Sequence, residues 1–327
     1  MYLVTGCAGF IGMHLTISLL KKNKSVIGID NMNNYYDVYL KKKRLSNLKK
    51  FKKFNFKKVD IKNLNSLKKI VKNYKIDYII NLAAQAGVRY SITNPETYFE
   101  NNIKGFFNIL EIAKSKKVKH LVYASSSSVY GASQKKVFKE SDNVDQPISF
   151  YASSKRSNEL MAHSYSYIYD IPVTGIRYFS VYGPWGRPDM SLFIFTKKIL
   201  SGKSIDVFNK GKMKRDFTFI DDAVNATYKI IHKIPKINRD NKICKFKIFN
   251  VGGGNTISLI NYIKLIEKNL GIKAKKNLKG MQLGDVKATL SNNNDLKSSV
   301  KFNPKTNIKI GIKKFIDWYK SFYLNEK

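Results

Sequence analysis

The sequence predicts an α/β protein in which a doubly wound parallel sheet is joined to a smaller C-terminal domain. Short apolar segments alternate with helical segments through the first half of the chain, and this alternation is typical of right-handed βαβ units. A turn with three regularly spaced glycines follows the first apolar segment. The chain of 327 residues is also longer than one compact domain usually is, which predicts the second unit.

The first turn predicts a dinucleotide site. The apolar segment 2–4 leads into the turn, and an amphipathic helix begins at Phe10 and Ile11. The glycines of the turn are Gly6, Gly9 and Gly12. The first permits a tight turn, the second lets backbone N–H groups approach a pyrophosphate, and the third allows close packing of helix on strand. The N-terminus of the helix adds positive potential for the anion.

The second predicted strand, 25–30, ends in Asp30. A carboxylate at this point accepts the ribose hydroxyls and repels a 2′-phosphate, so it favours NAD over NADP. Further strands are predicted at residues 54–60, 77–82, 120–125, 172–178 and 245–251, and helices at residues 66–74, 95–114, 151–169 and 221–233. We expect an NAD-binding domain over 1–179, rejoined by 217–251, and a substrate-binding lid over 180–216 and 252–327. The ligand crevice lies where the parallel strands end.

Composition excludes several other classes of protein. The formal net charge is +37, but the lysines are spread over nearly every predicted surface segment without an aromatic stacking pattern, which indicates a solvated surface and no specific nucleic-acid partner. Two cysteines and four scattered histidines predict no disulfide framework and no metal site. The chain begins directly in the first strand and has no apolar run of about 18 residues, so we expect a cytoplasmic protein without a membrane partner.

Three side chains predict proton-transfer chemistry. Tyr151 and Lys155 are four residues apart and therefore share one face of a helix. Held near the positive nicotinamide ring, such a tyrosine would have the pKa of its phenol lowered and could then act as a general base, while the lysine binds the nicotinamide ribose. The run 125–128 consists of four serines at the end of a predicted strand, where Ser126 would meet a substrate hydroxyl.

The glycine turn together with Ser126, Tyr151 and Lys155 resembles the extended short-chain dehydrogenase/reductase superfamily, and the resemblance covers nearly the whole chain. It implies a Rossmann fold. Longer segments closely resemble the UDP-glucuronate 4-epimerases of that superfamily: 35–37 after Asp30-Asn31, 84–89, 183–190 and 211–217. Two positions depart from the usual pattern, since Leu283 stands where proline is usual and Ser180 where threonine is often found. Ser180 keeps the hydroxyl.

The resemblance implies a set of ligand contacts. The cofactor-binding residues are Gly6, Gly9, Phe10, Ile11, Gly12, Asp30, Asn31, Asp60, Ile61, Leu82, Ala83, Ala84, Gln85, Asn101, Tyr151, Lys155 and Tyr178. The substrate-binding residues are Arg89, Ser127, Ser128, Ser180, Arg187, Arg215 and Asp285. The arginines suit a UDP-sugar because guanidinium forks bind diphosphates and carboxylates. The helices 95–114 and 151–169 would pair with a second copy in a homodimer.

The reaction expected from this set is NAD-dependent C4 epimerisation of a UDP-hexuronate, from UDP-glucuronate to UDP-galacturonate, through a transient 4-keto sugar. The serines 127, 128 and 180 would hold the uronate carboxylate. A 4,6-dehydratase is disfavoured because it needs an acid pair where Ser127 and Ser128 stand. The open alternatives are a UDP-glucose 4-epimerase, a UDP-glucuronate decarboxylase, and a non-catalytic NAD-sensing or nucleic-acid-binding protein of the same fold.

Overall fold

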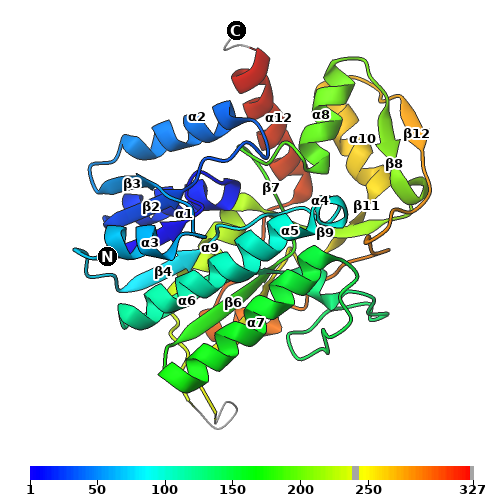
Figure 1. Ribbon diagram of the computed structural model, residues 1–327. Coiled ribbons are helices and arrows are strands. Elements are labelled where there is room, and N and C mark those ends of the chain that lie inside the picture. The colour runs from blue at the N-terminus through cyan, green and yellow to red at the C-terminus, as the bar shows by residue number, and fades with distance from the viewer. Residues whose placement is uncertain (238–242, 325–327) are drawn as a thin grey trace.

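A seven-stranded parallel sheet forms the centre of the computed structural model, which describes residues 1–237 and 243–324 (Figure 1). The spatial order is β3-β2-β1-β4-β5-β6-β10. The strands are β1 Tyr2–Thr5, β2 Val26–Asp30, β3 Phe54–Lys58, β4 Tyr78–Asn81, β5 His120–Ser126, β6 Val173–Tyr178 and β10 Phe246–Val251. The order reverses between β1 and β4, and a crevice for ligands opens at such a point. The predicted strands and the doubly wound class are confirmed.

Helices cover both faces of the sheet because successive strand residues point to opposite sides. Leu3 and Ile79 belong to one apolar core, whereas their neighbours Val4 and Ile80 belong to the other. The first core is covered by α3 Leu64–Val71, α6 Gly105–Ser115 and α7 Phe150–Tyr169. The second is covered by α1 Phe10–Lys21 and α9 Ile220–Ile231, with α2 Val38–Lys49 packed on α1. In Figure 1, α6 and α7 run side by side in front of the sheet.

A smaller lobe lies beyond the ends of the strands, at the upper right of Figure 1. It contains a three-stranded sheet of order β11-β9-β7 and a parallel pair, β12 with β8. These elements are β7 Ser180–Tyr182, α8 Ser191–Leu200, β8 Ile205–Val207, β9 Lys214–Phe219, β11 Thr256–Ser258, α10 Leu259–Leu270 and β12 Lys276–Leu278; the C-terminal helices are α11 Asn294–Val300 and α12 Ile308–Leu324. The lobe shares one continuous apolar core with the α1 face of the sheet, so it is fixed against the main body. The domain boundaries expected from the sequence stay a prediction.

The segment predicted as one helix over 95–114 is divided into three pieces. It consists of α5 Pro95–Tyr98, a π-helical turn η1 Phe99–Lys104, and α6. π-helical turns are often found at functional sites, and this one carries Asn101 and Asn102. The other short elements are α4 Tyr90–Thr93, the 3₁₀ turn η2 Ser127–Tyr130 and η3 Phe208–Gly211.

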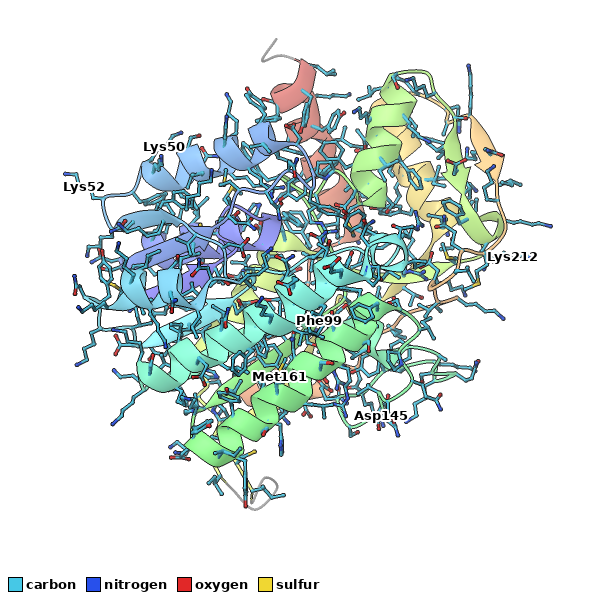
Figure 2. The ribbon with its side chains drawn as sticks, viewed as in Figure 1. Lys50, Lys52, Phe99, Asp145, Met161 and Lys212 are labelled. Atoms are coloured by element: carbon cyan, nitrogen blue, oxygen red, sulfur yellow. The ribbon has the colours of Figure 1, made fainter. Side chains whose placement is uncertain are left out.

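Lysines dominate the outside of the molecule. Figure 2 shows Lys50, Lys52 and Lys212 projecting outward from different parts of its periphery. Among the described residues, no helix is both long and apolar enough to span a membrane. The cytoplasmic location stays a prediction.

Candidate active site

A cavity of about 1080 Å³ opens where the strands of the main sheet end, between that sheet and the smaller lobe. All the predicted site residues line it except Asp60. The Asp60 carboxylate instead accepts hydrogen bonds from Asn31 Nδ2 at 3.0 Å and from the Lys62 backbone N–H at 2.9 Å. Asp60 therefore orients Asn31, which does line the cavity, and the contact of Asp60 itself with the cofactor stays a prediction.

The glycine turn forms one end of the cavity and leaves no room for side chains. Gly6 has φ +69°, and a Cβ on Gly12 would lie 2.0 Å from the Gly6 carbonyl oxygen. The Gly9 N–H donates to that same oxygen at 2.9 Å. At the end of β2, the nearly buried Asp30 carboxylate accepts the Ala8 and Met32 N–H groups at 3.1 and 2.8 Å. A glycine turn without side chains fits the pyrophosphate of a dinucleotide, and the Asp30 carboxylate beside it fits the adenosine ribose.

Lys41 is a cavity residue that the sequence did not indicate. It is 5% exposed, and its Nζ donates to the Asn33 carbonyl and side-chain oxygens at 2.8 and 2.6 Å. Burial lowers the pKa of Lys41, and the nearby charge of Asp30 opposes this shift. The helix that carries it, α2, was not predicted. The usable signal was Asp37, whose carboxylate caps α2 by accepting the Tyr39 N–H at 2.8 Å.

The three predicted catalytic side chains come from two neighbouring elements. The hydroxyl of Ser149 caps α7 by accepting the Ala152 N–H at 3.1 Å, which places Tyr151 in the first turn. Lys155 follows one turn later and is 3% exposed, and its Nζ donates to the Ala124 carbonyl on β5 at 2.9 Å. Ser126 ends β5, and its hydroxyl accepts the Ser128 N–H at 3.1 Å.

The pKa values of Tyr151 and Lys155 move in opposite directions. Burial raises the pKa of Tyr151, and although Ser126 and the charge of Arg187 lower it, they do not outweigh burial. Burial lowers the pKa of Lys155 to about 8. Desolvation disfavours the phenolate, so the protein groups alone do not lower the phenol pKa, and the lowering expected from the positive nicotinamide ring stays a prediction. A further positive charge beside the ring is needed to make Tyr151 a base at neutral pH.

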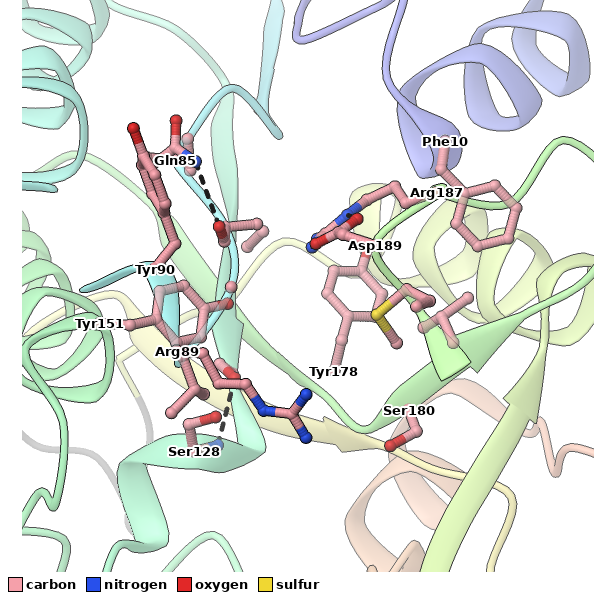
Figure 3. A pocket seen from close by; sticks show the side chains of 18 of the residues that line it. Phe10, Gln85, Arg89, Tyr90, Ser128, Tyr151, Tyr178, Ser180, Arg187 and Asp189 are labelled. Atoms are coloured by element: carbon pink, nitrogen blue, oxygen red, sulfur yellow. Dashed lines mark hydrogen bonds and ion pairs between the residues drawn. The ribbon is translucent and has the colours of Figure 1, made fainter. Parts of the chain in front are cut away.

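Arg187 faces this centre from the loop that follows β7, with its guanidinium held in place by Asp189. Its Nε donates to Asp189 Oδ1 at 2.9 Å, and its Nη2 donates to the second carboxylate oxygen. Tyr35 also donates to Asp189, at 3.3 Å. Figure 3 shows Arg187 and Asp189 across the pocket from Tyr151. The sequence assigned no role to Asp189 or Tyr35, although an acid two residues from an arginine was a usable signal.

A second basic group joins the main body to the smaller lobe. The Asp285 carboxylate accepts Arg215 Nη2 at 3.0 Å and lies 3.7 Å from Arg89 Nη2. The Arg89 guanidinium also lies over the Phe208 ring, 4.8 Å from its centroid. Two arginines around one carboxylate leave a net positive charge at this end of the cavity, which suits a diphosphate.

A buried ion pair beneath the site fixes the catalytic elements to one another. Glu159 on α7 accepts two hydrogen bonds from Arg177 on β6, each at 2.8 Å, and one from the Ser125 hydroxyl at 2.6 Å. Ser125 precedes Ser126, and Glu159 lies one helical turn beyond Lys155. The pair was not predicted, although an acid at this spacing after Tyr151 and Lys155 could have indicated it.

Comparison with known proteins adds independent information. A model of the NAD dependent epimerase/dehydratase family matches residues 2–252. The chain is 47% identical over 330 residues to Protein CapI of Staphylococcus aureus, with 98% of each chain covered. It is 40% identical over 334 residues to a probable UDP-glucuronate 4-epimerase of Rhizobium meliloti, with 98% of this chain and 97% of that protein covered. Among solved structures, UDP-glucuronic acid 4-epimerase from Bacillus cereus in complex with UDP-glucuronic acid and NAD superposes with a TM-score of 0.89 at 33% identity, covering 98% of this chain and 99% of that one.

Proposed function

Because the chain belongs to the NAD dependent epimerase/dehydratase family, we propose that it catalyses NAD-dependent C4 epimerisation of a UDP-hexuronate, interconverting UDP-glucuronate and UDP-galacturonate. One observation carries the proposal: a single cavity joins the dinucleotide turn and the Ser126, Tyr151 and Lys155 side chains to a half lined by arginines and serine hydroxyls. A protein that only senses NAD or binds nucleic acid has no need of all three reactive side chains.

Each reactive side chain has one task. NAD, held by the glycine turn, Asp30 and Lys155, would supply reversible hydride acceptance at C4, and the 4-keto sugar must turn within the cavity to present its opposite face. Tyr151 Oη takes the proton of the C4 hydroxyl and gives it back, and Ser126 Oγ holds that hydroxyl in line. Lys155 Nζ, in its buried place beside the Ala124 carbonyl, binds the nicotinamide ribose. No net oxidation results.

The uronate carboxylate requires separate control, because a 4-keto uronate is a β-keto acid and can lose CO₂. The hydroxyls of Ser127, Ser128 and Ser180 all line the same cavity and would hold the carboxylate against that loss. At the other end, Arg89 and Arg215 would bind the diphosphate. Asp285, which pairs with both arginines in this structure, would then be free to bind the ribose of the sugar nucleotide. Arg187 lies between these ends and adds positive charge close to the reacting carbon.

Product analysis tests the proposal directly. The purified protein, given UDP-glucuronate without added NAD, should form UDP-galacturonate, separated by chromatography and identified by mass spectrometry and NMR. A UDP-pentose as the main product would identify a decarboxylase instead. Faster turnover of UDP-glucose than of UDP-glucuronate would identify a neutral-sugar epimerase, and no product from either would overturn the enzyme assignment.

We also propose that two copies pair across α6 and α7. The outer face of these helices exposes large apolar side chains, such as Leu160 at 55% and Ile168 at 61%. Figure 2 labels Met161 on α7 and Phe99 on the adjoining turn η1. Large apolar side chains exposed together on one face mark a site of protein–protein contact, and a two-fold axis would let each copy cover the face of the other.

Sedimentation measurements test the dimer. The wild-type chain should sediment as a dimer, and Leu160→Glu should produce monomers that keep their circular dichroism spectrum. Ile310→Glu is the matched control, because Ile310 on α12 has the same 55% exposure and lies away from this face. A monomeric wild type, or a dimer that Leu160→Glu does not weaken, would contradict this proposal.

A further inference from the structure

Arg44 on α2 is a buried charge that the proposed chemistry does not use. It is 0% exposed and does not line the cavity. It forms no ion pair with any carboxylate of the described residues, and its Nε has no hydrogen-bond partner among them. A buried cation without a counter-charge is costly to keep, so its position requires an explanation.

The two terminal nitrogens of Arg44 connect two parts of the active site. Nη1 donates to the Ala8 carbonyl in the glycine turn at 3.2 Å and to the Tyr36 hydroxyl at 2.6 Å. Nη2 donates to the Trp185 and Gly186 carbonyls at 2.6 and 3.2 Å. Residues 185 and 186 directly precede Arg187. One guanidinium therefore spans the cofactor turn and the loop that carries the substrate arginine.

His14 makes a parallel connection from the cofactor side. It belongs to α1, does not line the cavity, and its Nε2 lies 3.0 Å from the Pro184 carbonyl oxygen. Trp185 directly follows Pro184, which His14 contacts, and its own carbonyl accepts from Arg44. Trp185 has φ +63°, a left-handed conformation that is unfavourable for a bulky residue. The loop therefore keeps this conformation only because its surroundings fix it.

We propose that Arg44 and His14 are positioning residues that hold the 183–187 loop against the glycine turn, so that Arg187 is set at a fixed place relative to the bound cofactor. This inference rests on the proposed function. Lysine cannot replace Arg44, because one ammonium cannot reproduce the planar fork that reaches four oxygens on separate segments. The peptide whose carbonyl Arg44 binds also carries the Gly9 N–H that closes the glycine turn on the Gly6 carbonyl, so the same side chain steadies both partners.

The two tryptophans of the chain give a direct probe of this loop. Trp185 lies in the loop, and Trp318 on α12 packs against it with ring centroids 5.4 Å apart. Trp318 Nε1 has no hydrogen-bond partner among the described residues, so Trp318→Phe removes no hydrogen bond and keeps an aromatic ring against the loop; Trp185 is then the only tryptophan, and excitation beyond the tyrosine absorption band selects its emission over that of the 20 tyrosines. In that background, Arg44→Lys and His14→Phe should shift the Trp185 emission to longer wavelength and raise its quenching by acrylamide at least twofold. His14→Gln keeps a donor and should restore much of the wild-type signal.

Kinetics separate positioning from general destabilisation. Arg44→Lys should raise KM for UDP-glucuronate about tenfold and His14→Phe about threefold. Both should shift the acid limb of the kcat/KM profile to higher pH, since the charge of Arg187 lowers the pKa of Tyr151. If both residues act through Arg187, adding either change to Arg187→Lys should lower kcat/KM by less than a further twofold, because the effects of coupled sites are not additive.

Each result has a defined meaning. The inference would be overturned if folded Arg44→Lys and His14→Phe proteins kept the wild-type Trp185 emission, KM and pH profile. It would also be overturned if the kcat/KM loss of either variant multiplied fully with the loss caused by Arg187→Lys. If Arg44→Lys does not fold, His14→Phe and its glutamine counterpart carry the test. An inactive wild type would overturn the proposed function, and the emission measurements with UDP as the probe would still decide whether these residues hold the loop.

Discussion

At the scale of single residues, burial decides the chemistry. Tyr151 and Lys155 occupy places from which water is largely excluded, so the neutral form of each is favoured. The charge of Arg187 lowers the pKa of Tyr151, and Asp189 holds the Arg187 guanidinium in place. The reactivity of the tyrosine therefore depends on charges brought to it by segments distant in the sequence.

Tyr151→Phe tests the assignment of the base. The variant should lose epimerase activity by about two to four orders of magnitude, the usual contribution of general acid–base catalysis. NAD should remain bound, because Lys155 keeps its own contact with the Ala124 carbonyl. Activity is measured by product formation and NAD content by release on denaturation. Turnover within threefold of wild type would show that another group takes the proton.

At the scale of elements, the glycine turn and α7 bring backbone and side chains to the ends of the strands. The turn depends on close contact between backbone atoms, which only glycine permits at Gly6 and Gly12. Helix α7 depends on its serine cap for its starting point and on the Glu159–Arg177 pair for its attachment to the sheet. Both elements therefore need exact placement as well as the right residues.

Gly12→Ala should disrupt the turn, because the new Cβ would lie 2.0 Å from the Gly6 carbonyl oxygen. We expect at least a tenfold loss of NAD affinity, measured by calorimetry, together with a lower melting temperature. Gly280→Ala is the control, since a Cβ there meets nothing within 4 Å. Equal NAD affinity in the two variants would show that the turn relaxes at little cost and is not the dinucleotide site.

At the scale of the whole molecule, a strongly charged surface encloses buried groups that must stay neutral. The net charge of +37 favours solubility but adds self-repulsion to the folded state. Inside, His14 and His120 are held neutral, because burial lowers the pKa of each from 6.5 to about 4. His120 lies between the Ile231 carbonyl and the Thr174 hydroxyl at 2.9 and 2.8 Å.

These histidines predict loss of stability in acid. Below pH 6.5 the unfolded chain binds protons that the folded protein does not accept until about pH 4. The free energy of unfolding should therefore fall as pH decreases through this range, by up to roughly 3 kcal/mol per histidine. His120→Gln should remove about one proton from the slope of stability against pH, measured by urea denaturation. An unchanged slope in this variant would refute the prediction.

The sequence by itself determined the main sheet, and it predicted the glycine turn and the trio Ser126, Tyr151 and Lys155 that the structure brings to one cavity. These features depend on local patterns: alternation of apolar segments, glycine spacing, and the four-residue interval between Tyr151 and Lys155. The carboxyl ends of parallel strands all lie at one edge of the sheet. Residues that follow the strands therefore come together at that edge, whatever the placement of the helices. For this reason nearly every site residue expected from the sequence lines the cavity, and only Asp60 does not.

Only the tertiary structure decided the smaller lobe, the role of Lys41 and the protonation of Tyr151. The strands β7, β9 and β11 are three to six residues long and pair across wide gaps in the sequence, so no local pattern marks them. Burial of a phenol or an ammonium is likewise set by what packs over it. Arg44 illustrates the difference: it is one basic residue among 60 in the sequence, and folding removes it from water and places it between the cofactor turn and the substrate loop.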